Sequence, residues 1–123
     1  MLKAKDIMTT DVTTIQSSAT VAEAMEIMKS KGLRGLIAVP PSKDDAYGMV
    51  SETDIVYKVK STGKDASQVK VADIMTKPCI VVNPDLSVDN VAQLFANTKI
   101  RRAPVIQEKL LGIISITDIL RKG

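Results

Sequence analysis

The sequence predicts an α/β (α+β) fold made of two tandem β-α-β-β-α units that pack with pseudo-twofold symmetry. The first observation behind this prediction is a repeat: Asp6 to Thr9, which reads Asp-Ile-Met-Thr, returns as Asp73 to Thr76. The second is the block Gly48 to Ile55, whose pattern Gly-apolar-apolar-Ser-x-Thr-Asp-Ile returns at 112–119. A repeat of about 55 to 65 residues is short for an independent domain, so we expect the two copies to complete one core together.

Each copy is expected to begin with a short helical lead-in, at about 4–9 and 71–76. An extended segment should follow it, at 12–15 in the first copy and at 80–82 in the second. We therefore divide the chain into a first repeat (1–61), a polar linker (62–69) and a second repeat (70–123).

The first long helix is predicted between Thr20 and Gly32. Thr20 and Glu23 have the spacing of a capping box, in which each side chain accepts a hydrogen bond from the other residue's backbone N–H. Apolar residues then recur at i, i+3, i+4 and i+7, and glycine is favoured where a helix ends. In the second copy Ser87 is the expected cap, and the same apolar face recurs at 88–95.

Two short apolar strands bounded by turn residues are expected after each helix: 33–39 and 47–50 in the first copy, 100–106 and 111–114 in the second. The first pair is joined by a Pro-rich loop at 40–45, which holds three extra residues relative to the second copy. The second pair is joined by a tighter loop at 107–109. The last helix of each copy then begins at a serine, Ser51 or Ser115.

Composition excludes several classes of function. The chain has 123 residues, no His and one Cys, so it cannot form a histidine-based triad, a His metal site or a thiolate metal cluster. The two Tyr and one Phe are too few for a platform on which bases stack, and a net charge of +3 is too mild to mark a nucleic-acid surface. No nucleophile–base pair can be assembled, so we expect no enzyme.

The sequence also bears on the location of the protein. No apolar run is long enough to span a bilayer, and charged residues interrupt the amino-terminal stretch where a signal peptide would lie. The single Cys79 allows no intrachain disulfide. We expect a cytoplasmic protein that does not contact membranes.

The repeated Ser-x-x-Asp is the candidate functional motif. Ser51 and Ser115 would cap the last helices, and Asp54 and Asp118 would face the positive end of the helix dipole. The same geometry offers backbone N–H groups and a hydroxyl to a phosphate, and a carboxylate to two ribose hydroxyls. From the residues alone, a purely structural role and a ligand-binding role both remain open.

Together these motifs resemble the CBS-domain pair, or Bateman module, over essentially the whole chain. The resemblance rests on the two Asp-Ile-Met-Thr lead-ins, the two Gly-to-Ile blocks and Ile100 to Ile106, which is similar to the family's basic, apolar, Pro-Val strand. It implies clefts between the repeats that commonly bind adenosine-containing ligands. It also implies a stand-alone regulatory role on another protein chain.

The resemblance assigns roles to individual residues. Asp54 and Asp118 would take ribose hydroxyls. Contacts to phosphate or to ribose hydroxyls would come from Ser51, Thr53, Ser115, Thr117, Arg34, Arg101 and Arg102. The adenine would be lined by Thr13 and Thr14 beside Asp118, and by Cys79, Ile80 and Val81 beside Asp54. The first copy lacks the second basic residue and the strand proline, so phosphate binding is expected mainly at Arg101 and Arg102.

The expected function is a regulatory, ligand-sensing module that binds AMP, ADP or ATP, uses no catalytic cofactor and modulates an unknown partner protein. A homodimer is expected, because the apolar faces at 21–28 and 88–95 are large for so small a chain. The alternatives are a dimerisation scaffold and a binder of another adenosyl ligand, such as S-adenosylmethionine. Nucleic-acid binding is suggested by a pI of about 9.0 but opposed by scattered lysines and few aromatic residues.

Overall fold

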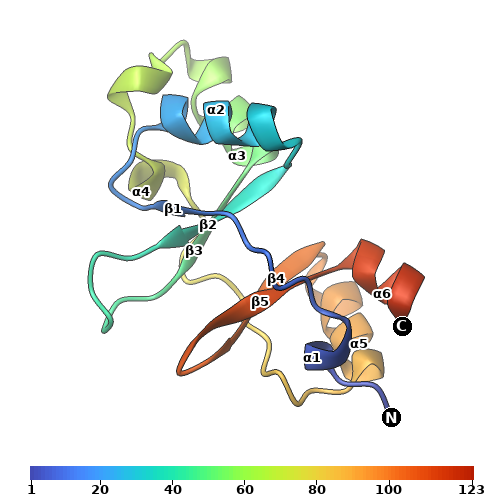
Figure 1. Cartoon of the computed structure of the whole chain (residues 1–123). Helices are drawn as coiled ribbons and strands as arrows, with labels where there is room; N and C mark the ends of the chain where they lie inside the picture. Colours follow the sequence, from blue (N-terminus) through green and yellow to red (C-terminus); the bar gives the residue numbers. More distant parts are fainter. The chain divides into compact units, whose positions relative to one another are not determined.

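The computed structural model describes residues 1–123 as two compact units (Figure 1). One unit consists of Thr13–Cys79, and we call it the Asp54 unit. The other joins Met1–Val12 to Ile80–Gly123, and we call it the Asp118 unit. Each unit therefore contains the lead-in helix of one repeat and the strands and long helices of the other.

The Asp54 unit holds a three-stranded sheet of order β1-β2-β3. Strand β1 runs parallel to β2, with Thr14 opposite Ile37, and β2 runs antiparallel to β3, with Gly35 opposite Ser51. Helices α2 and α3 lie above the strands in Figure 1. The elements of this unit are β1 (Thr14–Gln16), α2 (Val21–Lys31), β2 (Gly35–Val39), β3 (Gly48–Ser51), α3 (Glu52–Lys58), the 3₁₀ turns η1 (Lys60–Thr62) and η2 (Ala66–Gln68), and α4 (Val71–Ile74).

Helix α2 begins and ends where the sequence predicts. The Thr20 hydroxyl accepts a hydrogen bond from the Glu23 N–H at 3.1 Å, and Gly32 ends the helix with a φ of 65°. Such left-handed backbone favours glycine. The expected return bond from the Thr20 N–H to the Glu23 side chain is not formed, so the predicted capping box is only half correct.

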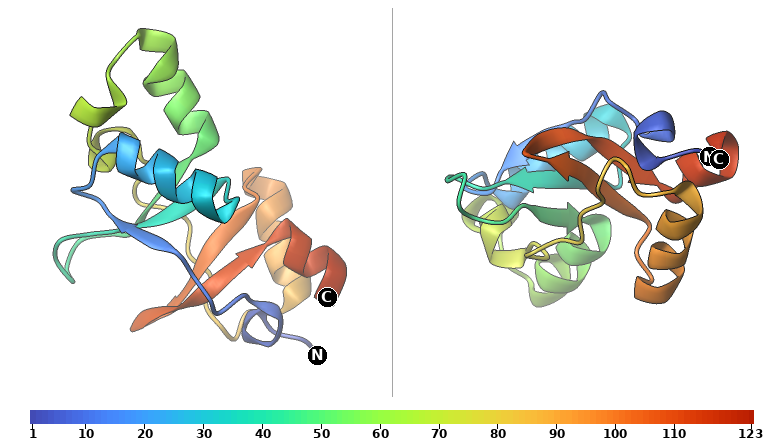
Figure 2. Two further views of the ribbon diagram at one scale, coloured as in Figure 1. Left: turned by 45° about the horizontal axis from the view of Figure 1, so that its top comes forward. Right: turned by 90° about the horizontal axis from the view of Figure 1, so that it is seen from below.

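The Asp118 unit holds a two-stranded sheet in which β4 and β5 run antiparallel, with Arg102 opposite Ser115. Its elements are α1 (Ala4–Ile7), α5 (Val88–Thr98), β4 (Arg102–Gln107), β5 (Lys109–Ser115) and α6 (Ile116–Lys122). Figure 2 shows the two chain ends close together in this unit, the amino terminus beside α1 and the carboxyl terminus after α6. Helices α1 and α6 are in contact.

The predicted strand at 80–82 is wrong, because only Val82 pairs with the sheet. Val82 donates to Pro104 O at 2.9 Å and accepts from the Ile106 N–H at 3.0 Å, which makes a single parallel bridge to Val105. The chain then reaches Pro84, whose nitrogen carries no hydrogen to extend a ladder. No comparable strand forms on this edge of β4.

Each unit has its own apolar core. In the Asp54 unit it consists of Ile15, Val21, Ala24, Met28, Leu36, Ala38, Val50, Ile55, Val59, Val71 and Ile74. In the Asp118 unit it consists of Ala4, Ile7, Val82, Val88, Val91, Phe95, Ala103, Val105 and Ile114. The apolar faces of α2 and α5, from which a homodimer was expected, are therefore buried inside the units. That reason for a dimer is wrong, because these side chains already have partners.

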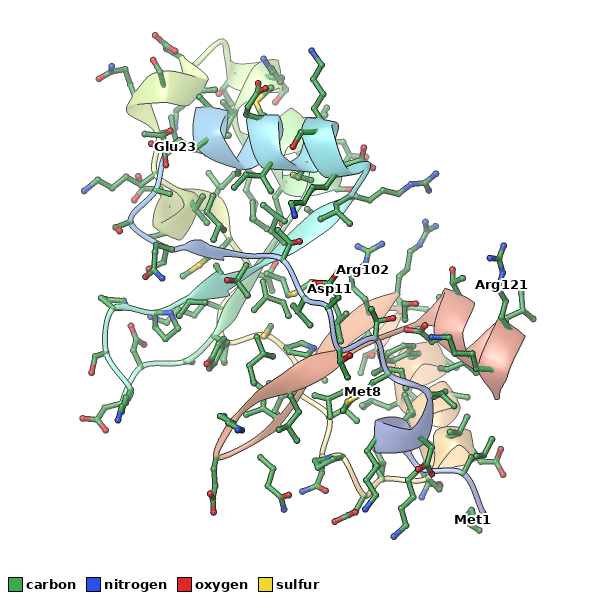
Figure 3. All side chains as sticks on the ribbon, in the orientation of Figure 1. Met1, Met8, Asp11, Glu23, Arg102 and Arg121 are labelled. Carbon is green, nitrogen blue, oxygen red and sulfur yellow. The ribbon has the colours of Figure 1, made fainter.

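The glycine that opens each repeated block has a steric reason. In the Asp118 unit, Thr9 exchanges two backbone hydrogen bonds with Ile113, of 2.8 and 2.9 Å. A Cβ added at Gly112 would lie 2.7 Å from the Thr9 carbonyl oxygen. Figure 3 labels Met8, whose sulfur would lie 2.8 Å from that added Cβ. The lead-in segment can therefore approach β5 only because residue 112 has no side chain.

None of the helices is both long enough and apolar enough to cross a membrane.

Candidate functional site

The repeated serine and aspartate form a complete capping box at the start of α3. The Ser51 backbone N–H and hydroxyl both donate to Asp54 Oδ2, each at 3.0 Å, and the Ser51 hydroxyl accepts from the Asp54 N–H at 3.2 Å. The start of α6 repeats this arrangement, with Ser115 and Asp118 at 3.0, 3.1 and 3.1 Å. The predicted caps are confirmed, and the carboxylates do more than face a helix dipole, because each closes its own cap.

A lysine one helical turn later meets the second oxygen of each aspartate. Lys58 Nζ lies 3.2 Å from Asp54 Oδ1 and donates to the carbonyl oxygen of Ile74, the last residue of α4, at 2.8 Å. The Lys58 ammonium thus joins the Ser51–Asp54 motif to the carbonyl end of the lead-in helix α4.

In α6 the same two contacts are made by Lys122. Its Nζ lies 3.1 Å from Asp118 Oδ1 and 3.4 Å from the carbonyl oxygen of Ile7. Neither lysine is among the site residues predicted from the sequence, although Asp-x-x-x-Lys follows the repeated serine in both copies.

Thr9 adds a further contact in the Asp118 unit alone. Its hydroxyl donates to Asp118 Oδ1 at 3.2 Å. Thr76 is the equivalent residue of the second lead-in, and its side chain is exposed. The aspartate side chains are both largely buried, Asp54 being 14% exposed and Asp118 9%. Thr9 is not among the site residues predicted from the sequence, because nothing in the sequence distinguishes it from Thr76.

The arginine-bearing strand starts lie beside these helix starts. Arg34 O accepts from the Glu52 N–H at 3.0 Å, and Arg101 O accepts from the Ile116 N–H at 2.9 Å. Arg34 and Arg101 are exposed. Arg102, the first residue of β4, is half-buried (Figure 3). In each unit the structure therefore brings a predicted phosphate-binding residue next to the Ser-Asp motif through the backbone. Thr53 and Thr117, in the first turns of α3 and α6, are exposed.

A groove of about 470 Å³ lies between α2 and α3. Its walls are mostly apolar, and Arg34, Lys29 and Lys60 bring positive charge to them. The lining residues are Met25, Met28, Lys29, Gly32, Leu33, Arg34, Glu52, Ile55, Val56 and Lys60. Neither Ser51 nor Asp54 is among them, so the capping carboxylate does not line this groove.

The predicted adenine-lining segments belong to different units. Thr13 and Thr14 are half-buried in the Asp54 unit, and Ile80 and Val81 are 38% and 48% exposed in the Asp118 unit. The predicted pairing of each segment with the aspartate of the other copy stays a prediction. Cys79 is half-buried and donates its N–H to Tyr47 O at 3.1 Å. Burial raises the pKa of the Cys79 thiol, which favours the neutral, apolar form expected of it.

The inserted loop of the first copy is tied down by an ion pair. Lys77 Nζ lies 2.6 and 2.7 Å from the two carboxylate oxygens of Asp45. The hydrogen bond from Lys77 lowers the pKa of Asp45. No group of three or more His, Cys, Asp or Glu side chains is placed to hold a metal ion.

Comparisons with known proteins agree with this architecture. Residues 4–61 and 71–123 each match the CBS domain. The hexameric CBS-CP12 protein from bloom-forming cyanobacteria is 59% identical, with a TM-score of 0.90 over 99% of this chain and 72% of that one. CBS domain-containing protein YhcV of Bacillus subtilis is 32% identical, covering 97% of this chain and 84% of its own.

Two further proteins are similar to this chain. Hypoxic Response Protein I, whose crystal structure contains two coordinated zinc ions, is 28% identical with a TM-score of 0.84 over 98% of both chains. Protein MK0525 of Methanopyrus kandleri is 35% identical over 90% of this chain, which spans only 57% of that protein's length. With two matched domains over most of its length, the chain belongs to the CBS-domain family, as a CBS-domain pair.

Proposed function

We propose that this CBS-domain pair is a regulatory module that binds an adenine nucleotide, AMP, ADP or ATP, and thereby modulates a partner protein. The ribose would be held by a capping aspartate, and the phosphates by the arginines at the strand starts. The module carries out no reaction of its own in this proposal. Its output is the altered affinity of another chain.

The observation that supports the proposal most is the twofold occurrence of one arrangement. In both units a buried carboxylate closes a serine cap, and an arginine strand start lies beside that cap through a backbone hydrogen bond. Carboxylates recognise vicinal hydroxyls, and guanidinium groups recognise phosphates. A stability role accounts for the caps, but it does not account for exposed arginines at both strand starts.

Calorimetry with four ligands in parallel tests the proposal: AMP, ATP, adenosine and S-adenosylmethionine. We expect AMP and ATP to bind more tightly than adenosine, because only they offer phosphates to the arginines. Arg101→Ala should weaken AMP by about tenfold and leave adenosine unchanged. A control variant is Lys43→Ala, in the exposed inserted loop. If none of the four ligands binds, the proposed function is wrong.

A phosphate-free adenosyl ligand is the second candidate, and one observation favours it. The first copy has one arginine, Arg34, at the strand start where the second copy has two, Arg101 and Arg102. The Asp54 unit therefore offers fewer guanidinium groups to a phosphate. Tighter binding of S-adenosylmethionine than of AMP, unaffected by Arg101→Ala, would select this candidate.

We also propose that the protein is a homodimer, on different grounds from those the sequence suggested. Large apolar side chains are exposed at equivalent positions of the last helices, with Val56 50% and Leu120 82% exposed. Tyr57 and Ile116 on the same helices are 70% and 47% exposed. Large apolar side chains exposed two to a helix in this way are typical of interfaces.

A further inference from the structure

We infer that the groove between α2 and α3 binds a free fatty acid of medium chain length. The alkyl chain would lie on the apolar lining, and the carboxylate would pair with the cations of the walls, chiefly Lys29 and Lys60. This inference goes beyond the proposed function and does not depend on it. Neither lysine is among the residues expected to contact a nucleotide, and neither Ser51 nor Asp54 lines the groove.

The groove has the size and the lining of a site for one small molecule. Its volume of about 470 Å³ lies within the range of about 300 to 1,000 Å³ that is typical of ligand pockets. Met28 and Ile55 are 6% and 5% exposed and form its buried floor, whereas Val56 is 50% exposed. Met25 also lines it, and flexible methionine side chains adapt well to an alkyl chain.

The charged side chains of the groove favour an anion. Lys29, Arg34 and Lys60 line it together with a single carboxylate, that of Glu52. All four side chains are exposed, and none of them forms an ion pair. An anionic head group can therefore pair with the cations without displacing a partner, whereas a cationic head group would be repelled.

The second repeat shows that the fold does not require these charges. Ala96 of α5 is equivalent to Lys29, and Ile116 of α6 is equivalent to Glu52. The apolar lining positions, in contrast, remain apolar in the second repeat, as Ala92, Phe95, Ile100, Ile119 and Leu120. Packing thus accounts for the apolar residues of the groove, but it does not account for Lys29.

A second copy of the chain is the competing occupant, because Val56 also belongs to the apolar surface proposed for the dimer. The most exposed apolar side chain of that surface is Leu120 of α6, and the last turn of α6 carries Arg121 and Lys122 beside it. The cations of the groove would repel this basic turn. Charge therefore favours an anionic ligand over the α6 helix of a second copy.

Calorimetry with sodium decanoate tests the inference, with octanoate and decyltrimethylammonium titrated in parallel. We expect one decanoate to bind per chain. Octanoate should bind about tenfold more weakly, because it buries two CH₂ groups fewer. Decyltrimethylammonium has the same alkyl chain and the opposite charge, and it should not bind measurably. No binding of decanoate, or equal binding of decanoate and decyltrimethylammonium, would overturn the inference.

Charge variants test the role of the walls. Lys29→Ala introduces the residue that the second repeat has at this position, and it should lower the affinity for decanoate about threefold to fivefold. Glu52→Gln should raise that affinity about twofold, because it removes the carboxylate nearest in kind to the ligand's own. Lys31→Ala is the matched control, since Lys31 lies on the same helix outside the groove, and it should change nothing. An equal loss for Lys29→Ala and Lys31→Ala would contradict recognition by the groove.

The position of the ligand is checked by NMR of the methionine methyl groups. Decanoate should shift the signals of Met25 and Met28 and leave that of Met8, in the other unit, unchanged. The titration is repeated over the range of chain concentrations in which sedimentation follows dimerisation, and we expect the same affinity throughout. Shifts at Met8 alone would place the ligand elsewhere. Binding that is lost as the chain dimerises would assign the groove to a second copy and overturn the inference.

Discussion

The Asp54 unit and the Asp118 unit build the same motif with the same bond lengths to within about 0.1 Å, yet they surround it differently. The first has three strands and an inserted loop, and the second has two strands joined by a turn at Glu108, which has a φ of 66°. Thr9 reaches the aspartate in one unit, and Thr76 is exposed in the other. An internal repeat thus preserves local bonds, while the neighbouring segments differ in the contacts that they add to the motif.

The largest expected difference between the units concerns the two glycines of the repeated block. A Cβ at Gly112 would meet a backbone oxygen, that of Thr9, at 2.7 Å, and backbone atoms cannot easily move away. A Cβ at Gly48 would first meet the flexible Met75 sulfur at 2.6 Å, with the Thr76 oxygen at 3.1 Å. Gly112→Ala should therefore lower the free energy of unfolding by about 2 to 3 kcal/mol, and Gly48→Ala by about 1 kcal/mol. Chemical denaturation measures both, and a larger loss for Gly48→Ala would break the comparison.

The next difference concerns the threonines of the two lead-ins. Thr9→Val removes a partly buried hydrogen bond to a carboxylate, so the free energy of unfolding should fall by about 1 to 2 kcal/mol. Thr76→Val changes an exposed side chain and should stay within about 0.5 kcal/mol of the parent. Equal losses for the two variants, measured by urea unfolding, would show that the units are equivalent at this position.

Comparison of the units also shows what a sequence can predict. The caps at Thr20, Ser51, Ser87 and Ser115 were predicted correctly, because a cap depends on residues three positions apart. The same is true of the helix end at Gly32. Local spacing carries this information.

Contacts between distant segments could not be predicted in this way. The bond from Lys58 to Ile74 O joins residues that are 16 positions apart, and that from Thr9 to Asp118 joins residues 109 apart. The strand predicted at 80–82 is a different case, because Pro84 is visible in the sequence and lacks the N–H that the next step of the ladder needs. The apolar faces of α2 and α5 could not be assigned to core or to interface from their periodicity alone.

The homodimer proposal yields a smaller effect that again compares the units. Leu120 in α6 is more exposed than Val56 in α3, 82% against 50%. Leu120→Lys should weaken dimerisation by about tenfold or more, and Val56→Lys by less. Lys43→Glu, in the exposed inserted loop, serves as the control. Sedimentation velocity over a range of concentrations gives the dissociation constants, and a parent chain that stays monomeric at every concentration would refute the dimer.

The smallest expected effect concerns the inserted loop, which only the Asp54 unit has. Lys77 lowers the pKa of Asp45, so this pair stabilises the folded protein above the unfolded pKa of the carboxyl. That contribution is lost as the pH falls through the folded pKa. Lys77→Met should raise the pKa of Asp45 toward 3.8, as followed by NMR titration of the carboxyl carbon. An unchanged titration would mean that the ion pair does not persist in solution.

The most direct test of the central claim, that this CBS-domain pair recognises an adenine nucleotide, is calorimetric titration of the parent chain with AMP and with adenosine in low salt. We expect AMP to bind more tightly, and added salt to reduce its advantage, because exposed arginines supply the difference. Arg101→Ala should remove most of that advantage as well. Equal binding of AMP and adenosine would contradict phosphate recognition, and binding of neither would contradict the central claim.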